Sequence, residues 1–216
     1  MKIALSITAW IGAYLLGSIP TGLVWARMLK HIDVRREGSG RTGGANVWRT
    51  AGFPAALLTA LTDTLKGAAA IWLAQYLGLN AWGTAVAGTL AILGHNYSLF
   101  LGFRGGAGTA TSLGVASALW PPSLPILVVS GVSVGLLVGH SSVASILIAL
   151  MLPHLFIIPG EPAWIVGFGL PAMGLTLWAL RPNILRLLKQ EERFLPIYFR
   201  KPPLICLCKH PSSHQG

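Results

Sequence analysis

Four long stretches of the 216-residue chain contain no Asp, Glu, Lys or Arg and are rich in apolar side chains. They comprise 24, 37, 56 and 19 residues, at positions 3–26, 67–103, 105–160 and 162–180. A membrane-spanning helix needs about 20 predominantly apolar residues. We therefore expect an all-α, polytopic integral membrane protein, whose first apolar segment is a retained span and not a cleaved signal peptide.

Helix-breaking residues divide these stretches into spans. Single crossings are expected over four segments, at about 4–26, 52–77, 80–101 and 163–180. The 56-residue block connects Arg104 on one side of the membrane with Glu161 on the other, so it must cross an odd number of times. Three groups of breakers mark its joints: Trp120-Pro121-Pro122, Gly139-His140-Ser141-Ser142 and Pro159-Gly160-Glu161-Pro162. Three short crossings give seven transmembrane helices in total, with five as the alternative if part of the block is re-entrant.

Composition and charge support the membrane class and set an orientation. Hydrophobic residues make up 53% of the chain and charged residues only 10%, which excludes disorder and an ordinary soluble domain. The net charge of +10 could indicate nucleic acid, but the basic residues cluster beside the spans, and we expect no nucleic-acid partner. Placing fourteen of the sixteen Lys and Arg residues in the cytoplasm leaves only Lys2 outside and Lys66 within a span. The N-terminus is then outside and the C-terminus inside.

Residues 37–49, between the first two spans, are rich in glycine and polar side chains. Glycine lets the backbone approach a ligand closely, and successive exposed N–H groups can bind an anion. Ser39 and Asn46 add neutral hydrogen-bonding groups, and Arg49 can hold a phosphate through two parallel hydrogen bonds. The alternative is a flexible basic loop attracted to anionic lipid. Residue types alone leave both interpretations open.

Residues 94–111 carry three glycines within four positions, Gly105, Gly106 and Gly108, followed by hydroxyl side chains that enter an apolar helix. A helix N-terminus of this kind suits an anion, although the Lys-Ser/Thr pair of a Walker A motif is absent. A tight turn between two spans is the alternative. His95 alone is a weak signal, because a histidine at a membrane edge is more often an anchor than a catalyst.

Two further features place charge in or beside the spans. Residues 181–193 combine an apolar face with several basic side chains, which is typical of an amphipathic helix at the membrane interface. Asp63 and Lys66 lie three residues apart within the second span and therefore share a helix face. We expect these two charges to neutralise each other, with contact between Lys66 and a substrate as the alternative.

In this order and on these spans, the polar segments resemble the motifs of one known family. The first motif reads Gly38-Ser39-Gly40-x-x-Gly43-x-x-Asn46-x-x-Arg49 and is followed by Asp63-x-x-Lys66-Gly67. The second reads Gly94-His95-x-x-x-x-Phe100-x-x-Phe103-Arg104-Gly105-Gly106-x-Gly108-x-Ala110-Thr111, and the third reads Asn183-Ile184-x-Arg186-Leu187. The family is the bacterial acyl-phosphate:glycerol-3-phosphate acyltransferases of the PlsY type.

The resemblance covers about residues 8–193, so we expect a single membrane domain over 1–193 and a basic C-terminal tail over 194–216. Cys206 and Cys208 lie in this tail, and their Cys-x-Cys spacing is poor for a strain-free disulfide. We therefore expect two ordinary thiols, with palmitoylation as the alternative.

The resemblance implies a seven-helix enzyme of the bacterial inner membrane, with its active site at the cytoplasmic face. It implies transfer of a fatty acyl group from acyl phosphate to the 1-hydroxyl of glycerol 3-phosphate, giving lysophosphatidate and inorganic phosphate. It also implies that no metal and no organic cofactor take part. Membrane lipid surrounds the protein, and we expect no obligate protein partner.

By position in the motifs, the resemblance implies two sets of site residues. The catalytic set is Ser39, Arg49 and Asn183. The set that binds substrate or phosphate is Gly38, Gly40, Gly43, Asn46, His95, Arg104, Gly105, Gly106, Gly108 and Ser142. Ser142 belongs to a Ser-Ser-Val-Ala-Ser segment that resembles a serine segment of the family.

Two departures from the family pattern fall within the motifs. The family has lysine where this chain has Ala107, and histidine where this chain has Leu180. Loss of one charged donor from a preorganised site typically costs about 10²–10³ in rate. The leading hypothesis is a membrane acyltransferase with weak or altered activity. The alternatives are a non-catalytic paralogue that binds a phospho-ligand or lipid headgroup, and, less favoured, a small solute transporter.

Overall fold

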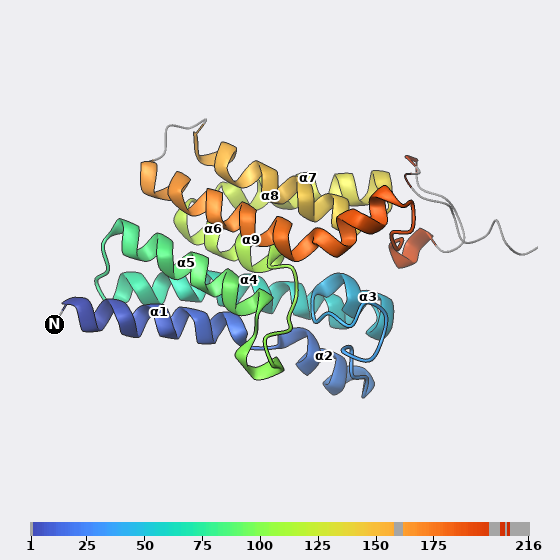
Figure 1. Cartoon of the computed structure of the whole chain (residues 1–216), viewed down its shortest axis with the longest axis horizontal. Helices are drawn as coiled ribbons and strands as arrows, with labels where there is room; N and C mark the ends of the chain where they lie inside the picture. The colour runs from blue at the N-terminus through green and yellow to red at the C-terminus, as the bar shows by residue number, and fades with distance from the viewer. Residues whose placement is uncertain (1, 158–161, 199–203, 206, 208–216) are drawn as a thin grey trace, which may run out of the picture.

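The computed structural model describes residues 2–157, 162–198, 204, 205 and 207, and all regular structure in these residues is helical (Figure 1). The α-helices are α1 (Lys2–Ser18), α2 (Thr21–Lys30), α3 (Gly44–Ala51), α4 (Phe53–Tyr76), α5 (Ala81–Asn96), α6 (Thr109–Leu119), α7 (Ser123–Val138), α8 (Ser141–Ile157) and α9 (Ala163–Leu188). Two short 3₁₀ turns, η1 (Leu99–Leu101) and η2 (Pro196–Tyr198), follow α5 and α9. Cys206 and Cys208 lie outside the described residues.

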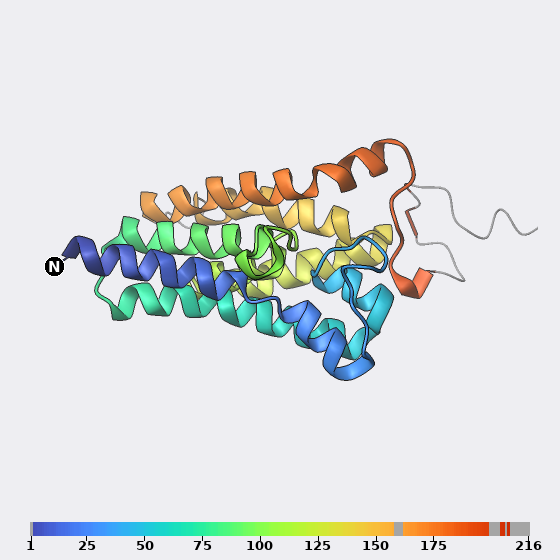
Figure 2. The same ribbon diagram turned by 60° about the horizontal axis from the view of Figure 1, so that its bottom comes forward.

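The long helices run side by side along the long axis of the molecule (Figures 1 and 2). Within the described residues, three segments are long and apolar enough to cross a membrane: Ile3–Lys30, Phe53–Tyr76 and Ala163–Leu188. Between the last two, α5, α6, α7 and α8 have 11 to 17 residues each and reverse direction in turn. α6, α7 and α8 occupy the 56-residue block, where the sequence predicts three short crossings, and each is shorter than the about 20 residues of an ordinary span. The number of crossings and their orientation stay predictions.

The first apolar segment, which the sequence predicts as one span over about 4–26, is one candidate span over Ile3–Lys30 and is interrupted by a break at Ile19 and Pro20. Proline has no N–H to continue the helix, and its ring clashes with the preceding turn. α2 therefore bends away from the axis of α1 (Figure 2). The break frees the Ile19 carbonyl, which accepts hydrogen bonds from the Thr21 amide and from Nζ of Lys66, each at 3.0 Å.

The other boundaries follow the predicted breakers closely. α4 matches the expected second span, and the Trp120-Pro121-Pro122 joint falls between α6 and α7. Gly139 and His140 separate α7 from α8, while residues 159–161 of the third joint lie outside the described residues. The sequence predicts that the third span ends near residue 101, but α5 ends at Asn96. The chain leaves the helix there and forms η1.

Small residues bring the helices into close contact. A Cβ at Gly17 of α1 would lie 2.0 Å from the carbonyl oxygen of Ala91 on α5, and a Cβ at Gly94 would lie 2.2 Å from that of Tyr14. Helices in membranes associate through such small side chains, because lipid supplies no hydrophobic drive for helices to meet.

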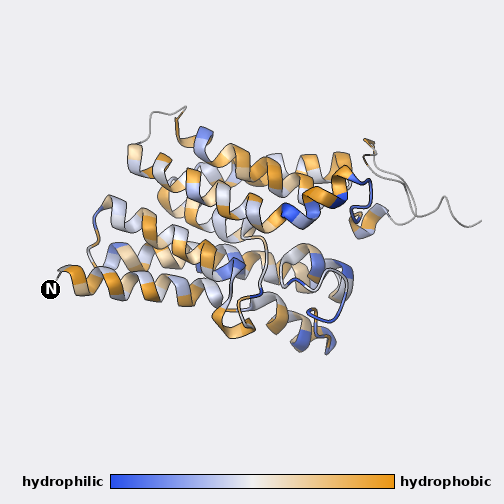
Figure 3. Cartoon of the chain, viewed as in Figure 1, coloured by the Kyte–Doolittle hydropathy of each residue, from blue (hydrophilic) through white to orange (hydrophobic). Residues whose placement is uncertain are grey.

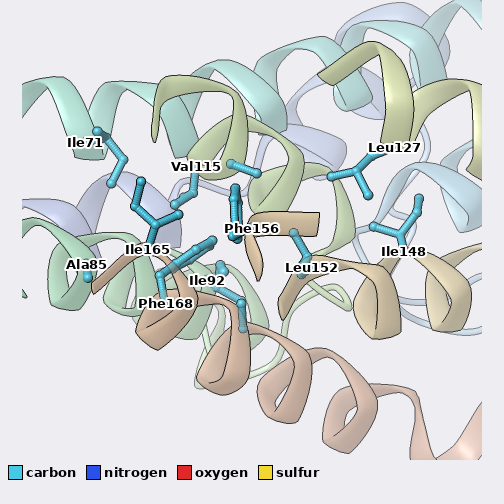
Figure 4. Packing of buried hydrophobic residues seen from close by; sticks show 12 residues of the cluster. Ile71, Ala85, Ile92, Val115, Leu127, Ile148, Leu152, Phe156, Ile165 and Phe168 are labelled. Carbon is cyan, nitrogen blue, oxygen red and sulfur yellow. The ribbon is translucent and has the colours of Figure 1, made fainter. Parts of the chain in front are cut away.

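The main apolar core lies among α4, α5, α6, α7, α8 and α9 (Figure 4). Phe156 of α8 and Phe168 of α9 are fully buried at its centre, with ring centroids 6.4 Å apart. Hydrophilic residues gather instead around α2, α3 and the C-terminal half of α9, at one end of the molecule (Figure 3). The predicted segments 37–49 and 181–193 lie at this end, whereas the segment between α5 and α6 lies nearer the middle of the long axis (Figure 1).

Candidate active site

The loop between α2 and α3 is folded around the buried side chain of Asn46. Its Nδ2 donates hydrogen bonds of 2.9–3.1 Å to three loop carbonyls, those of Val34, Glu37 and Arg41. Its Oδ1 accepts a 2.8 Å hydrogen bond from the amide of Ser39. Gly38 has a φ of 57°, and a Cβ there would lie 2.3 Å from that same Oδ1, so only glycine fits. Asn46 therefore shapes the loop that presents Ser39.

Ser39 itself is half-buried, and its hydroxyl has no hydrogen-bond partner among the residues that the structure describes. The neighbouring Gly40 has a φ of 72°, a left-handed conformation that favours glycine. The backbone thus turns sharply on both sides of a serine whose hydroxyl is free to meet a ligand.

The two glycine-rich segments meet at Gly43 and Gly106. A Cβ at Gly43, the residue that precedes α3, would lie 3.8 Å from the Cα of Gly106. Gly106 in turn donates its amide to the carbonyl of His95 at 3.1 Å, and a Cβ on it would lie 2.1 Å from Nε2 of His95. A Cβ at Gly105 would lie 2.0 Å from the His95 carbonyl oxygen. Side chains at these glycines would push the second segment away from both α5 and the first segment.

Behind this contact lies a buried network centred on Asp63 of α4. Its Oδ1 is 2.7 Å from Nζ of Lys66, 3.5 Å from Nδ1 of His95 and 2.6 Å from Oγ1 of Thr21, which donates to it. Lys66 also donates to the Ile19 carbonyl. The expectation that the two charges of α4 neutralise each other is confirmed. Lys66 is only 6% exposed, and two of its three N–H groups have partners in the protein.

The second glycine segment leads into α6 through Gly108, whose φ is 82°. The hydroxyls of Thr109, Thr111 and Ser112 in the first turn of α6 are buried and have no hydrogen-bond partner within the described part of the chain. Arg104 is exposed, and none of the described residues pairs with it. The segment therefore offers buried donors at the start of α6 and a cation at the surface.

Arg49 extends from α3 to the segment that follows α9. Its Nε donates to the Phe194 carbonyl at 3.1 Å, and its Nη2 lies 3.3 Å from both the Arg193 carbonyl and the Ser141 hydroxyl. Burial lowers the pKa of Arg49, although arginine remains charged at any physiological pH. The predicted Ser142 is buried beside Ser141, and its hydroxyl has no hydrogen-bond partner among the described residues. The serine segment at the start of α8 thus reaches the first motif.

Asn183 lies on α9, one of the elements of the polar end. Its Nδ2 donates to Oε1 of Glu192 at 3.0 Å, and Oε2 of Glu192 accepts from Nε of Arg186, also at 3.0 Å. Glu192 is only 4% exposed, and it ties the C-terminal part of α9 to the segment that holds Arg49. Oδ1 of Asn183 is buried, and no residue in the described part of the chain donates a hydrogen bond to it.

The structure therefore brings most of the predicted site residues to one end of the bundle. The first motif touches the second at Gly43, the serine segment at Arg49, and α9 at Arg41, which donates to the Ala179 carbonyl. Arg104 is the exception, because no hydrogen bond or ion pair connects it to the other motifs within the described residues.

Sequence reasoning missed three contributors to this site: Arg41, Ser141 and Glu192. A signal existed for Glu192, which is an acidic residue in an otherwise basic segment. Ser141 directly precedes the predicted Ser142 in the same serine segment, so the sequence located the segment but selected the neighbouring serine. None of the described residues form a group of three or more His, Cys, Asp or Glu side chains suited to a metal ion.

The fold and the site together define a polytopic helical membrane protein, whose polar end presents arginine, serine and glycine backbone to anionic groups. A family model described as glycerol-3-phosphate acyltransferase matches residues 7–190. The chain belongs to this family of membrane acyltransferases.

Individual relatives agree. The glycerol-3-phosphate acyltransferase of Rubrobacter xylanophilus is 40% identical over 181 residues, covering 83% of this chain and 90% of the relative. The crystal structure of PlsY, an integral membrane glycerol 3-phosphate acyltransferase, superposes with a TM-score of 0.82 in its glycerol 3-phosphate form and 0.80 in its lysophosphatidic acid form. Each is 33% identical and covers 88% of this chain and 94% of that one.

These comparisons confirm the predicted family, the all-α integral membrane fold and the expectation of an acyltransferase enzyme. The non-catalytic alternative is not favoured. The boundary between domain and tail at residue 193 stays a prediction, and Phe194 and Leu195 just beyond it are buried.

Proposed function

We propose that the protein transfers a fatty acyl group from acyl phosphate to the 1-hydroxyl of glycerol 3-phosphate. The products are lysophosphatidate and inorganic phosphate. In this reaction the hydroxyl oxygen bonds to the acyl carbonyl carbon, the bond from that carbon to the phosphate oxygen breaks, and the hydroxyl proton passes to the departing phosphate. Support for both ends of the reaction comes from solved relatives, which are described as glycerol 3-phosphate and lysophosphatidic acid forms.

The observation that carries the proposal is the contact between the two glycine-rich segments. Gly43 and Gly106 are 63 positions apart, yet a Cβ at the first would touch the Cα of the second. Both substrates carry a phosphate group, so one site must hold two anions close together. Two adjoining glycine segments with arginines nearby supply backbone N–H groups and positive charge for this purpose.

Within this site, Ser39 and Arg49 have different tasks. The Ser39 hydroxyl, which no described residue engages, can donate to a phosphate oxygen or orient the attacking hydroxyl, and Arg49 supplies positive charge from α3. Acyl phosphate carries a good leaving group. Alignment and stabilisation of developing charge therefore contribute more to the rate than a strong nucleophile would.

The site functions at the cytoplasmic face of a bacterial inner membrane, in the orientation that the charge distribution predicts. Hydrophilic residues gather at the polar end of the bundle (Figure 3), and its helices α2, α3 and α9 carry Lys and Arg side chains. By the positive-inside rule, this end faces the cytoplasm, where soluble glycerol 3-phosphate can enter, and the acyl chain is supplied from the lipid side.

Phosphate release tests the proposal directly. Purified protein in detergent micelles is given acyl phosphate and glycerol 3-phosphate, and inorganic phosphate and lysophosphatidate are measured. We expect turnover that needs both substrates and that falls by about 10²-fold or more in Ser39→Ala. Ser133→Ala, an exposed serine on α7, is the matched control and should match the parent. Turnover that is equal in Ser39→Ala and the parent would contradict the assigned role.

The departures at Ala107 and Leu180 provide a second arm of the same experiment. Ala107 is half-buried in the second glycine segment, and Leu180 is buried on α9 next to Ala179. If the parent releases no phosphate but Ala107→Lys combined with Leu180→His does, the scaffold is an acyltransferase that has lost activity. If neither protein releases phosphate, the proposed reaction is wrong for this chain.

A further inference from the structure

The Arg41 side chain joins the first glycine segment to α9. Its Nη2 donates to the carbonyl oxygen of Ala179, 138 positions later in the chain. Its Nη1 is buried as well, yet no acceptor within the described residues pairs with it. A guanidinium has five N–H donors in a fixed planar fork, so a second acceptor beside the Ala179 carbonyl would be held in a defined direction.

An unpaired buried donor is unusual, because a polar group that leaves water without gaining a partner destabilises the fold. Hydrogen bonds hold both the backbone and the guanidinium of Arg41, so its burial is not an incidental contact of a surface side chain. Nδ2 of Asn46 holds the backbone carbonyl of Arg41 at 2.9 Å, and the guanidinium is anchored on α9. The fold thus holds the charged Arg41 guanidinium in a fixed position, although no anionic group among the described residues pairs with its Nη1.

The charges around Arg41 do not neutralise it. Arg186 and Arg181 of α9 repel it, while Glu192 and the hydroxyl of Tyr97 act in the opposite sense. Glu192 already accepts hydrogen bonds from both Asn183 and Arg186. Burial is the main cause that lowers the pKa of Arg41, and repulsion by Arg186 adds to it, but arginine stays protonated. The cluster therefore carries excess positive charge that an incoming anion would offset.

Arg41 also lies in the right place for a substrate. It is two residues from Ser39 and two from Gly43, which touches Gly106 of the second glycine segment. Oδ1 of Asn183, four residues beyond the Ala179 anchor, is a buried acceptor that likewise has no hydrogen-bond partner within the residues that the structure describes. A ligand that carries phosphate oxygens together with a hydroxyl group could satisfy both.

We propose that Arg41 binds the phosphate group of a substrate, with its Nη1 donating to a phosphate oxygen while its Nη2 stays on the Ala179 carbonyl. The assignment rests on the proposed function for the identity of the two phosphate compounds, glycerol 3-phosphate and acyl phosphate. Both have the same recognised group, and the experiment separates them.

The test compares Arg41→Met and Arg41→Lys with the parent in micelles, varying one substrate at a time. Arg41→Met keeps the length of the side chain and removes the charge. We expect it to raise KM for one of the two substrates by about tenfold to a hundredfold, the usual effect of losing a hydrogen bond from a charged group, and to change kcat less. The substrate whose KM rises identifies the phosphate that Arg41 binds. Arg41→Lys should recover part of the loss, because it restores charge without the planar fork.

Arg36→Met is the matched control, since Arg36 is an exposed arginine of the same loop, and its KM values should equal those of the parent. KM values in Arg41→Met within about twofold of the parent for both substrates would overturn the proposal. So would an equal rise in Arg36→Met, because the effect would then come from net charge alone. If Arg41→Met does not fold, Arg41→Lys decides, and parental KM values in it overturn the proposal.

Calorimetric titration of each protein with glycerol 3-phosphate and with acyl phosphate separates this inference from the proposed function. If the parent binds a phosphate compound without turnover, the proposed function fails. In that case the Arg41 assignment is supported if Arg41→Met weakens that binding by about tenfold or more, and it is overturned if the binding is unchanged. A parent protein that binds neither compound overturns the Arg41 assignment.

Discussion

The guanidinium of Arg49 on α3 donates a 3.1 Å hydrogen bond to the carbonyl oxygen of Phe194, which is 145 positions further along the chain. Phe194 is buried and stacks on the His140 ring, with centroids 4.4 Å apart, and the next amide, of Leu195, donates to the Gly139 carbonyl at 2.8 Å. The segment after α9 therefore packs on the turn between α7 and α8 and fixes the direction of Arg49.

Replacing Phe194 with alanine should destabilise the protein and reduce its activity together. The change removes a buried ring, which in protein cores costs about 3–5 kcal/mol, and loosens the carbonyl that holds Arg49. We expect a lower midpoint of thermal unfolding in micelles and a lower kcat. Ile197→Ala, in the same segment but half exposed, should change neither much. A stable Phe194→Ala protein with parental kcat would show that Arg49 does not depend on this segment.

Gly106→Ala should abolish most of the activity. A Cβ there would lie 2.1 Å from Nε2 of His95, so either the imidazole or the glycine segment must move. A displacement of about 1 Å in an active site can cost about 10²-fold in rate. Phosphate release measures the effect, and Gly174→Ala is the matched control, because a Cβ at Gly174 meets no atom within 4 Å. Equal rates in the two variants would contradict the close packing at Gly106.

Asp63→Asn should destabilise the protein strongly, because it leaves the Lys66 ammonium buried without its carboxylate. Breaking a buried ion pair on one side costs about 3–5 kcal/mol. The double variant Asp63→Asn with Lys66→Met removes the stranded charge and should recover part of the loss. Thermal unfolding of the parent, both single variants and the double variant measures the coupling. Additive effects of the two changes would mean that the pair does not interact.

Stability should fall at acidic pH through His140. Burial lowers the pKa of His140 below its ordinary value of 6.5, and the charge of nearby Arg49 lowers it further. The hydrogen bond with the Arg193 carbonyl and the charge of Glu192 act in the opposite direction and raise this pKa. The unfolded chain therefore binds the proton at higher pH than the folded protein does. Stability from this group is complete above about pH 6.5 and is lost as the pH falls.

The measurement is the midpoint of thermal unfolding between about pH 8 and about pH 5. His140→Asn keeps an N–H for the Arg193 carbonyl but cannot take up a proton in this range. It should lose less stability on acidification than the parent does. An identical pH dependence in both proteins would assign the acid sensitivity to other groups.

The positions of the helices were largely predictable from the sequence, because charge-free runs and breakers are local signals. α4 and the joint after Leu119 fall where the pattern places them. The break at Pro20 was visible as a proline in an apolar run, yet run length alone suggested a continuous span. Whether such a proline bends or divides a helix depends on which neighbour satisfies the freed carbonyl.

The residues of the candidate site were predictable, whereas the hydrogen bonds among them were not. The motifs placed serine, arginine and glycine at the correct end of the bundle. They did not show that the Asn46 side-chain amide forms hydrogen bonds with the loop backbone, or that the Arg41 side chain forms a hydrogen bond with α9. Those contacts depend on how segments more than a hundred residues apart meet, and no local pattern encodes the direction of a long side chain.

The divided first helix has a consequence for how the chain enters the membrane. The Lys66 ammonium is accommodated by Asp63 on its own helix and by the Ile19 carbonyl exposed at the break. During synthesis the N-terminal segment emerges first, so its open carbonyl is already in the bilayer when the second apolar segment leaves the translocation machinery. These two segments should therefore integrate as a hairpin, and a mutation that straightens the first would hinder insertion of the second before any active site exists.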